Sequence, residues 1–449
     1  MKKRLIIGML GLLLVTSVQA EDHVLAAARD GETRKDVPAV LELSLQDAQN
    51  YAVERNRSLK NASLAVQEAY AQRWQTIASM LPQLDGSIGK TIMYDEDFKE
   101  KMITFGGTTP MSMSPWAYGL TASLGFNGQG IVGIMLNNLA IGMKQIALGQ
   151  SESQLRGSVM SSYVSVLALQ SISALLDSSL VNIQDLEQMT QNAVNVGAAE
   201  QTTADQIRVR VNTLKNSINS QKRNIELATN SLKVLLDVPV ETQLVLTEPL
   251  ESVLSPDRVL DLLGQNFAIE NNLNYQLLKK QTELAEKNVH MAGWAYGPTV
   301  SLAYQYSYRD YGDSEGFSMM NSPHTVAFNI SMPLWSSGKR AAGVIEKKIA
   351  YEEAKNTLSE TTDNLEIQYR QLCFNLTNAY ETYMNEKDNI DVSQRVFASA
   401  TNKYKYGASS NMELTNASND LINAQSSYVQ AVLSLVNAQV ELEKFLNNK

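Results

Sequence analysis

The feature that most constrains this fold is the length of the segments that carry no helix-breaking residue. The chain has 449 residues but only 10 prolines, and none lies between Pro115 and Pro239 or after Pro333. Gly343 and Gly407 bracket 63 residues with neither glycine nor proline. Proline breaks helices, and 63 helical residues would extend about 95 Å. We therefore expect a mainly helical protein that is too long for one compact domain.

A coiled-coil pattern follows Gly407 and recurs 210 residues earlier, after Gly197. After Gly407, apolar residues alternate at steps of three and four: Leu414, Ala417, Leu421, Ala424, Tyr428, Ala431, Leu435, Ala438, Leu442 and Phe445. After Gly197, the same register gives Ala204, Ile207, Val211, Leu214, Ile218, Gln221, Ile225, Ala228, Leu232 and Leu235. This spacing is typical of a coiled-coil seam. It predicts that a long helix leads into each glycine turn and a shorter helix returns antiparallel to it.

The shared register belongs to a wider twofold repeat with a period of about 210 residues. Leu45 and Ala48 are matched by Leu260 and Leu263. Each repeat is expected to contain a helix, two strands, a long helix, a turn and a returning helix. We predict repeat 1 over residues 41–238, a linker over 239–257 and repeat 2 over 258–449.

Four segments alternate apolar and polar residues with a period of two, as β-strands do. They cover residues 83–93, 117–127, 298–309 and 324–333. In the clearest one, Val300, Leu302 and Tyr304 alternate with polar or small neighbours. Each segment has roughly the ten residues of a transmembrane strand, and its alternation is typical of a membrane β-barrel. A half-buried sheet of a soluble protein would alternate in the same way.

Three tryptophans favour the membrane interpretation. Trp116, Trp294 and Trp335 lie beside predicted strand ends, where aromatic side chains anchor proteins at a membrane interface. Four strands cannot close a barrel, because the smallest common membrane barrels have about eight, and lipid does not tolerate an open sheet edge. A membrane protein with this pattern must therefore form oligomers.

The N-terminus has the order of a secretory signal peptide. The basic residues Lys2, Lys3 and Arg4 precede an apolar run over 5–15, and Val18-Gln19-Ala20 supplies a cleavage site. We predict a signal peptide over residues 1–20 and a flexible segment over 21–40. No cysteine follows the apolar run, so we expect no lipid anchor there. No later segment approaches the roughly 20 apolar residues of a membrane-spanning helix.

Several kinds of chemistry are not supported by the sequence. The formal charge of −9 argues against a nucleic-acid partner, because phosphate binding needs a basic surface. Cys373 is the single cysteine, and the three histidines are scattered. The segment from Gly86 to Thr91 resembles the end of a phosphate loop, but Leu84 stands where that loop needs its first glycine. We expect no catalytic residues, no cofactor and no metal, and hence a protein that is not an enzyme.

Together these features resemble the outer-membrane efflux protein (TolC) family. Beside the repeat, the resemblance rests on Pro82-x-Leu84 with Pro298-x-Val300, on Pro333-Leu334-Trp335-x-x-Gly338, and on Tyr404-x-x-Gly407-x-x-Ser410-x-x-Glu413-Leu414-x-x-Ala417. It covers nearly all of the chain after the signal peptide. It implies a homotrimer whose three sets of four strands form a twelve-stranded β-barrel, continuous with a periplasmic α-helical barrel.

The resemblance also implies a function and partners. The function is that of a passive exit duct, opened at its periplasmic tip, for a tripartite efflux pump or a type I secretion system. The implied location is the outer membrane of a Gram-negative bacterium, with a large periplasmic part. The implied partners are a periplasmic adaptor protein, an inner-membrane RND or ABC transporter and the lipid bilayer. The alternative is a soluble periplasmic coiled-coil scaffold, which explains the seams and the export signal but not four membrane-length strands.

The resemblance finally assigns residues to the periplasmic tip. In the family, acidic residues six and nine places after the second-turn glycine form the constriction, and here these places hold Glu413 and Asn416. The family's tyrosine three places before that glycine is Tyr404, whereas Ser409 replaces its arginine two places after. The turns are expected to dock the adaptor through Gly197, Ala198, Gly407, Ala408 and Ser410.

Overall fold

The computed structural model describes residues 39–90, 116–310 and 324–446, which form two compact units. The helical unit combines residues up to Lys60 with Gln150–Ala268 and the chain from Glu366 onward. The sheet unit combines Asn61–Gly149 with Ile269–Leu365. Each unit thus draws on both halves of the chain. The predicted signal peptide and residues 21–38 lie outside the described residues.

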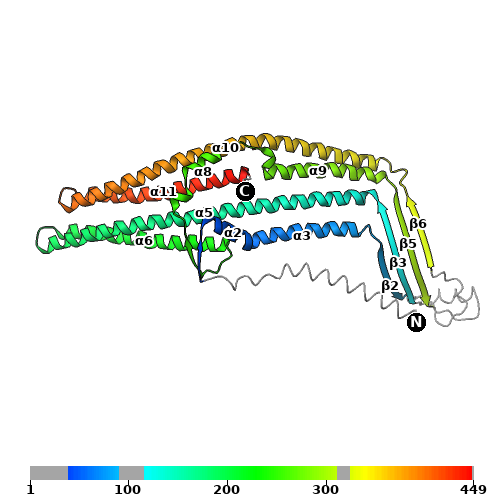
Figure 1. The fold of residues 1–449 in the computed structure, drawn as a ribbon, viewed down its shortest axis with the longest axis horizontal. Coiled ribbons are helices and arrows are strands. Elements are labelled where there is room, and N and C mark those ends of the chain that lie inside the picture. Colours follow the sequence, from blue (N-terminus) through cyan, green and yellow to red (C-terminus); the bar gives the residue numbers. More distant parts are fainter. Residues whose placement is uncertain (1–38, 91–115, 311–323, 447–449) are drawn as a thin grey trace, which may run out of the picture. The chain divides into compact units, whose positions relative to one another are not determined.

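The order of the elements repeats along the chain (Figure 1). The first series is β1 (Val40–Leu43), α2 (Leu45–Arg55), α3 (Arg57–Ala78), β2 (Gln83–Lys90), β3 (Trp116–Asn127), α5 (Gly128–Asn195) and α6 (Gln201–Leu235). The second is β4 (Gln243–Leu246), α7 (Leu250–Val253), α8 (Pro256–Leu263), η1 (Ile269–Asn271), α9 (Leu273–Gly293), η2 (Trp294–Tyr296), β5 (Thr299–Asp310), β6 (His324–Ser331), α10 (Lys339–Lys405) and α11 (Asn411–Leu446).

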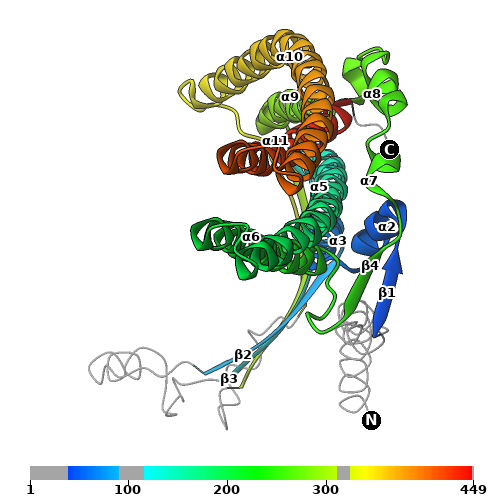
Figure 2. The same ribbon diagram turned by 90° about the vertical axis from the view of Figure 1, so that its left-hand side faces the viewer.

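Two very long helices dominate the chain, as the proline spacing predicts. α5 has 68 residues and α10 has 67, so each is about 100 Å long at 1.5 Å per residue. In the helical unit, α6 returns along α5 and α11 returns along α10 (Figures 1 and 2). In the sheet unit, α3 accompanies α5 through a hydrogen bond from Asn137 Nδ2 to Thr76 Oγ1 (2.7 Å).

The predicted coiled-coil seams form the core of the helical unit. On α6, the seam residues Ala204, Ile207, Val211, Leu214, Ile218 and Leu232 are buried. On α11, the buried seam residues are Leu414, Ala417, Leu421, Tyr428, Ala431, Leu435, Leu442 and Phe445. The polar seam residue Gln221 donates from Nε2 to the Leu169 carbonyl oxygen of α5 (3.1 Å), so its amide is satisfied without breaking the packing. The seam prediction is therefore confirmed.

A short parallel sheet in the helical unit has no counterpart in the predictions from sequence. β1 pairs with β4 over four residues each, although β4 lies in the segment expected to be a plain linker. The hydroxyl of Tyr163 on α5 donates to the Leu43 carbonyl (3.1 Å) and accepts from the Glu248 backbone N–H (3.4 Å). Burial raises the pKa of Tyr163, so the phenol stays protonated and holds both strand ends against α5.

The match of the first helices in the two repeats is wrong by one residue. Leu45 and Ala48 are buried on α2 as expected. On α8, however, Val259 and Leu262 are the buried pair, and Leu260 is 62% exposed. α8 has only eight residues and ends before Gly264, so too few apolar positions fix its register in the sequence.

The sheet unit contains four antiparallel strands in the order β2-β3-β5-β6. All four predicted strands are present, and the described part of the first ends at Lys90. The register places apolar residues in cross-strand rows on one face: Leu84, Ala122, Tyr304 and Val326 in one row, and Phe126, Val300 and Ile330 in another. Rows of small and polar residues such as Asp85, Thr121, Gln305 and Thr325 alternate with them. The sheet therefore has one apolar and one polar face.

The apolar face of the sheet is exposed. Ile88, Val326 and Phe328 are among its exposed residues, and no helix of the sheet unit covers them. Within the described residues, β2 and β6 each lack a partner on their outer edge. A soluble protein would normally cover both features, because exposed apolar faces and open edges promote aggregation.

The three tryptophans flank the strands as expected, but their surroundings differ. Trp116 begins β3 and lies under the Lys90 ammonium, 5.3 Å from its ring centroid. Trp335 follows β6 and is 85% exposed. The ring of Trp294 instead lies so close to Gly128 that a Cβ added there would be 2.2 Å from it. Trp294 thus packs where β3 becomes α5, in addition to being partly exposed.

One expectation about membrane helices needs correction. Among the described residues, α5 is long and apolar enough to cross a membrane by length and composition alone, contrary to the prediction that no later segment is. In its most apolar stretch, 56% of the residues are buried within the protein. That fraction is typical of a core helix, so this criterion is weak evidence for a membrane span.

Gly157 sets the distance between α5 and α11. A Cβ added there would lie 2.4 Å from Cγ1 of Val440. Gly157→Ala is therefore expected to destabilise the protein by about 1–3 kcal/mol through overpacking, measured as a lowered melting temperature. Gly142 on the same helix has nothing within 4 Å of an added Cβ, so the control Gly142→Ala should gain up to about 1 kcal/mol in helix propensity. If Val440→Ala does not rescue Gly157→Ala, the close approach is not the cause.

Candidate functional site

The site predicted from sequence lies at the two helical turns, which have the same backbone geometry. Gly197 and Gly407 adopt φ of +78° and +71°, a region that only glycine enters without strain. Ala198 N–H donates to the Ala193 carbonyl (2.8 Å), and Ala408 N–H donates to the Lys403 carbonyl (2.8 Å). Both turns are thus Schellman caps that satisfy the last carbonyls of α5 and α10.

The residue before each turn glycine projects a large side chain into solvent. Val196 is 79% exposed and Tyr406 is 81% exposed. These two positions are 210 residues apart, as are the glycines themselves. Met412, in the first turn of α11, is also exposed. Together the three side chains form an apolar surface, which we call the turn patch.

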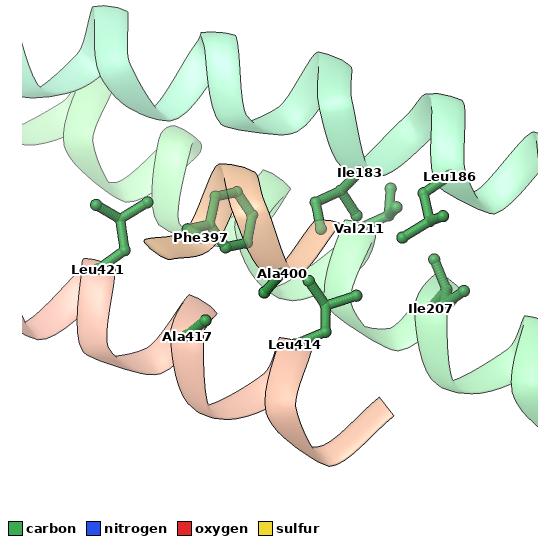
Figure 3. Packing of buried hydrophobic residues seen from close by; sticks show 9 residues of the cluster. All are labelled: Ile183, Leu186, Ile207, Val211, Phe397, Ala400, Leu414, Ala417 and Leu421. Carbon is green, nitrogen blue, oxygen red and sulfur yellow. The ribbon is translucent and has the colours of Figure 1, made fainter. Parts of the chain in front are cut away.

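A shared hydrophobic cluster holds the two turns at the same level. Leu186 and Ile207 flank the first turn, and Phe397 and Leu414 flank the second. All four are buried in one cluster contributed by α5, α6, α10 and α11 (Figure 3). Their similar distances in sequence from Gly197 and Gly407 mean that neither hairpin extends far beyond the other.

Glu413 lies in the first turn of α11, and a capping box holds it there. Its backbone N–H donates to Ser410 Oγ (3.2 Å), the arrangement expected of Ser-x-x-Glu at a helix start. Ser409 Oγ donates to Glu413 Oε2 (2.8 Å), and Lys403 Nζ lies 3.9 Å from Oε1. The side chain is half-exposed, so the Lys403 pair is worth little. Glu413 thus presents a positioned carboxylate at the turn.

Asn416 borders two cavities beside the turn. One, of about 490 Å³, lies between α10 and α11 and includes Arg395, Lys403, Glu413 and Asp420 in its lining. The other, of about 760 Å³, lies between α6 and α11 and is lined in part by Arg210, Thr415 and Met412. Both are polar in part and open, so they accommodate water and mobile ions better than a tightly bound ligand.

Tyr404 connects to a residue that the sequence reasoning missed. Tyr404 is partly buried against the cluster at the end of α10. Burial raises its pKa, and the nearby Arg210 guanidinium partly opposes that rise. Arg210, on α6, donates from Nη2 to Thr415 Oγ1 on α11. Desolvation lowers the pKa of Arg210 itself, and arginine remains charged in proteins nonetheless.

The geometry therefore links three helices through one cation. Arg210 bridges α6 to α10 at Tyr404 and to α11 at Thr415. Ser409, which occupies the place of the family's arginine, instead hydrogen-bonds Glu413 within its own turn. Arg210 lies 13 residues after the first turn. Its only sequence signal was a charged residue beside the α6 seam.

The described residues hold no group of three His, Cys, Asp or Glu side chains that could bind a metal ion. The sequence model of the family described as "Outer membrane efflux protein" matches residues 266–448. The chain is 23% identical to the "Toxin and drug export protein A" of Aggregatibacter actinomycetemcomitans over 417 residues, which is 88% of this chain and 85% of that protein.

Two further similarities extend the comparison. The chain is 22% identical to the "Probable efflux pump outer membrane protein TtgC" of Pseudomonas putida, over 64% of this chain and 59% of that protein. The crystal structure of the CmeC outer membrane channel of Campylobacter jejuni is similar with a TM-score of 0.67 at 16% identity, covering 90% of this chain and 85% of that one. The chain therefore belongs to the outer membrane efflux protein family.

Proposed function

We propose that this protein is the outer-membrane exit channel of a tripartite efflux pump in a Gram-negative bacterium. The observation that carries the proposal is a single chain in which an exposed, two-faced sheet is joined to helices about 100 Å long. The relatives named as efflux pump outer membrane protein and outer membrane channel support the same function. Proteins of this family are channels and not enzymes.

The sheet supports a trimer. Four strands with two open edges cannot remain in lipid, where every backbone N–H and C=O needs a partner. Three copies joined edge to edge give a twelve-stranded barrel, with the apolar face toward lipid and the polar face toward water. The hairpins of the three copies then form a helical barrel in the periplasm. Trp116 and Trp335, at opposite strand ends, would lie at the two membrane interfaces.

The channel is a passive conduit whose energy comes from an inner-membrane pump. We propose a periplasmic adaptor that contacts the turn patch and the backbones of Gly197, Ala198, Gly407, Ala408 and Ser410. An RND or an ABC transporter fits equally, and a type I secretion role is compatible with a relative named as a toxin and drug export protein. The side chains of the tip do not specify the cargo.

We propose that the tip is the gate. Three copies of Glu413 and Asn416 would form rings at the constriction, and rings of carboxylates favour cations. The bridge from Arg210 to Tyr404 and Thr415 would hold each hairpin pair in the closed arrangement. Because the phenol of Tyr404 is uncharged at physiological pH, given its raised pKa, the bridge should not respond to pH in that range.

The charge of the ring predicts ion selectivity. Glu413→Gln removes a half-exposed carboxylate from each chain while keeping its shape. We expect the preference for cations over anions to fall clearly, measured as the reversal potential in a salt gradient across a planar bilayer. The control Glu226→Gln changes an exposed carboxylate on α6 and should leave selectivity unchanged. Equal reversal potentials for Glu413→Gln and wild type would remove Glu413 from the constriction.

Membrane fractionation separates the channel from the coiled-coil scaffold alternative. An outer-membrane channel should appear in outer-membrane fractions, resist extraction by salt and alkali, and migrate as a trimer on gels until heated. A scaffold should be released with the soluble periplasm. Recovery of the full-length protein in the soluble fraction would overturn the proposal.

A further inference from the structure

The helix α6 carries an unusual concentration of positive charge for an acidic protein. From Gln206 to Ile225 it has five cations and no acidic residue. Arg208 forms an ion pair with Glu187 (3.2 Å), and Arg210 belongs to the bridge at the tip. Lys215, Lys222 and Arg223 are exposed, and no acidic group of the described residues forms an ion pair with them.

The helix α10 carries an acidic counterpart. Glu381 and Asp388 are exposed, and among the described residues neither has a basic partner. They are seven residues apart, as Lys215 and Lys222 are, and residues seven apart lie on one face of a helix. Further along the same face of α10, Phe374 and Ile367 are also exposed. This face therefore has both charge and apolar area with nothing of its own chain to cover them.

The charges on the two helices match in depth. Lys215 lies 18 residues after Gly197, and Asp388 lies 19 residues before Gly407. Lys222 lies 25 residues after Gly197, and Glu381 lies 26 before Gly407. Because the hydrophobic cluster holds the two turns at the same level, each lysine stands within about one helical rise of the depth of one carboxylate.

The two faces are not used for contacts between α6 and α11 of one chain. Arg210 marks the side of α6 that faces α11. Lys215 and Lys222 continue the row of Arg208 at steps of seven, and Arg208 contacts Glu187 on α5. On α10, the buried positions Leu376, Tyr383 and Ile390 alternate with Glu381 and Asp388, which point away from that core.

We infer that Lys215 and Lys222 of one copy pair with Asp388 and Glu381 of the next copy, and that this ladder fixes the register between adjacent chains. The inference rests on the proposed trimer. Rotation about an axis along the helices carries each residue to the next chain at unchanged depth, so a ring needs complementary surfaces at equal depth. The next position of the acidic row, Arg395, would meet Arg208, whose charge Glu187 already balances.

A disulfide test measures this neighbour relation directly. In a Cys373→Ser background, Lys222→Cys combined with Glu381→Cys should form disulfides between chains and give a covalent trimer on denaturing gels. The control pair Lys222→Cys with Arg395→Cys keeps the same face of α10 but shifts the partner by 14 residues, about 21 Å along the helix. It should form far less covalent trimer.

Charge reversal tests whether the ladder contributes energy. Lys215→Glu with Lys222→Glu should lower the temperature at which the trimer dissociates. Adding Glu381→Lys and Asp388→Lys should restore it, because the ladder is rebuilt with opposite polarity. Unchanged dissociation of the trimer together with lost adaptor binding would overturn the inference and make the basic row an adaptor site.

The outcomes separate this inference from the proposed function. Stable trimers that form neither the matched disulfide nor a charge-sensitive assembly would overturn the ladder and leave the channel proposal standing. Absence of any trimer in the wild-type protein would overturn the proposed function, and the ladder with it.

Discussion

Arg210→Ala is expected to open the periplasmic end of the channel. The substitution removes the cation that bridges α6 to Tyr404 on α10 and to Thr415 on α11. Hydrogen bonds to charged groups contribute about 1.5–3 kcal/mol. If that energy is present only in the closed arrangement, its loss shifts the ratio of closed to open tips by roughly ten- to a hundredfold.

Cells that carry Arg210→Ala should become sensitive to large antibiotics that the outer membrane normally excludes, and purified channels should spend more time open. Arg208→Ala is the matched control, since Arg208 lies on the same helix but forms only a partly exposed ion pair with Glu187. Wild-type antibiotic resistance and wild-type open time, at equal amounts of trimer, would show that Arg210 does not hold the gate.

Changing both exposed residues before the turns, Val196→Asp with Tyr406→Asp, is expected to abolish efflux while the channel itself persists. Both side chains are about four-fifths exposed, so the substitutions cost the isolated protein little. In a complex, the same carboxylates would be buried against the adaptor without a partner, which is costly. We expect drug resistance to fall to the level of a deletion strain.

The docking variant needs a control for surface charge. Val181→Asp introduces a carboxylate at an exposed position of α5, 16 residues before Gly197, and should leave efflux intact. Trimer formation and conductance of the double variant should equal those of wild type. Normal efflux by the Val196→Asp/Tyr406→Asp variant would contradict adaptor docking at the turn patch.

The long helices could be predicted from the sequence because their information is local and repeated. Ten consecutive seam positions after Gly407, from Leu414 to Phe445, agree with one register. The positive φ of Gly407 follows from the same pattern, because a helix that reverses direction at a glycine uses the conformation that glycine alone adopts cheaply. Many weak signals of the same sign leave little room for error.

The small parallel sheet could not be predicted in the same way. β1 and β4 have four residues each and are about 200 residues apart. Four residues are too few to establish a period of two. Their pairing depends on Tyr163, which the sequence marks only as one more aromatic residue within a long helix.

The gate could be predicted only in part for a related reason. Glu413 follows Ser410 by three residues, so its position at a helix start can be read from a local motif. Arg210 is connected to Tyr404 and Thr415, which are about 200 residues away. No local pattern distinguishes Arg210 from Arg208, and only the packing of the four helices brings Arg210 to the tip.

Single-channel recording of the purified wild-type protein in a planar lipid bilayer tests the central claim most directly. The channel account predicts that the protein inserts as a trimer and produces discrete, long-lived conductance steps, mostly small because the tip is closed. Larger steps should follow when Arg210 is replaced by alanine. A correctly folded protein that produces no conductance steps in either form would contradict the account.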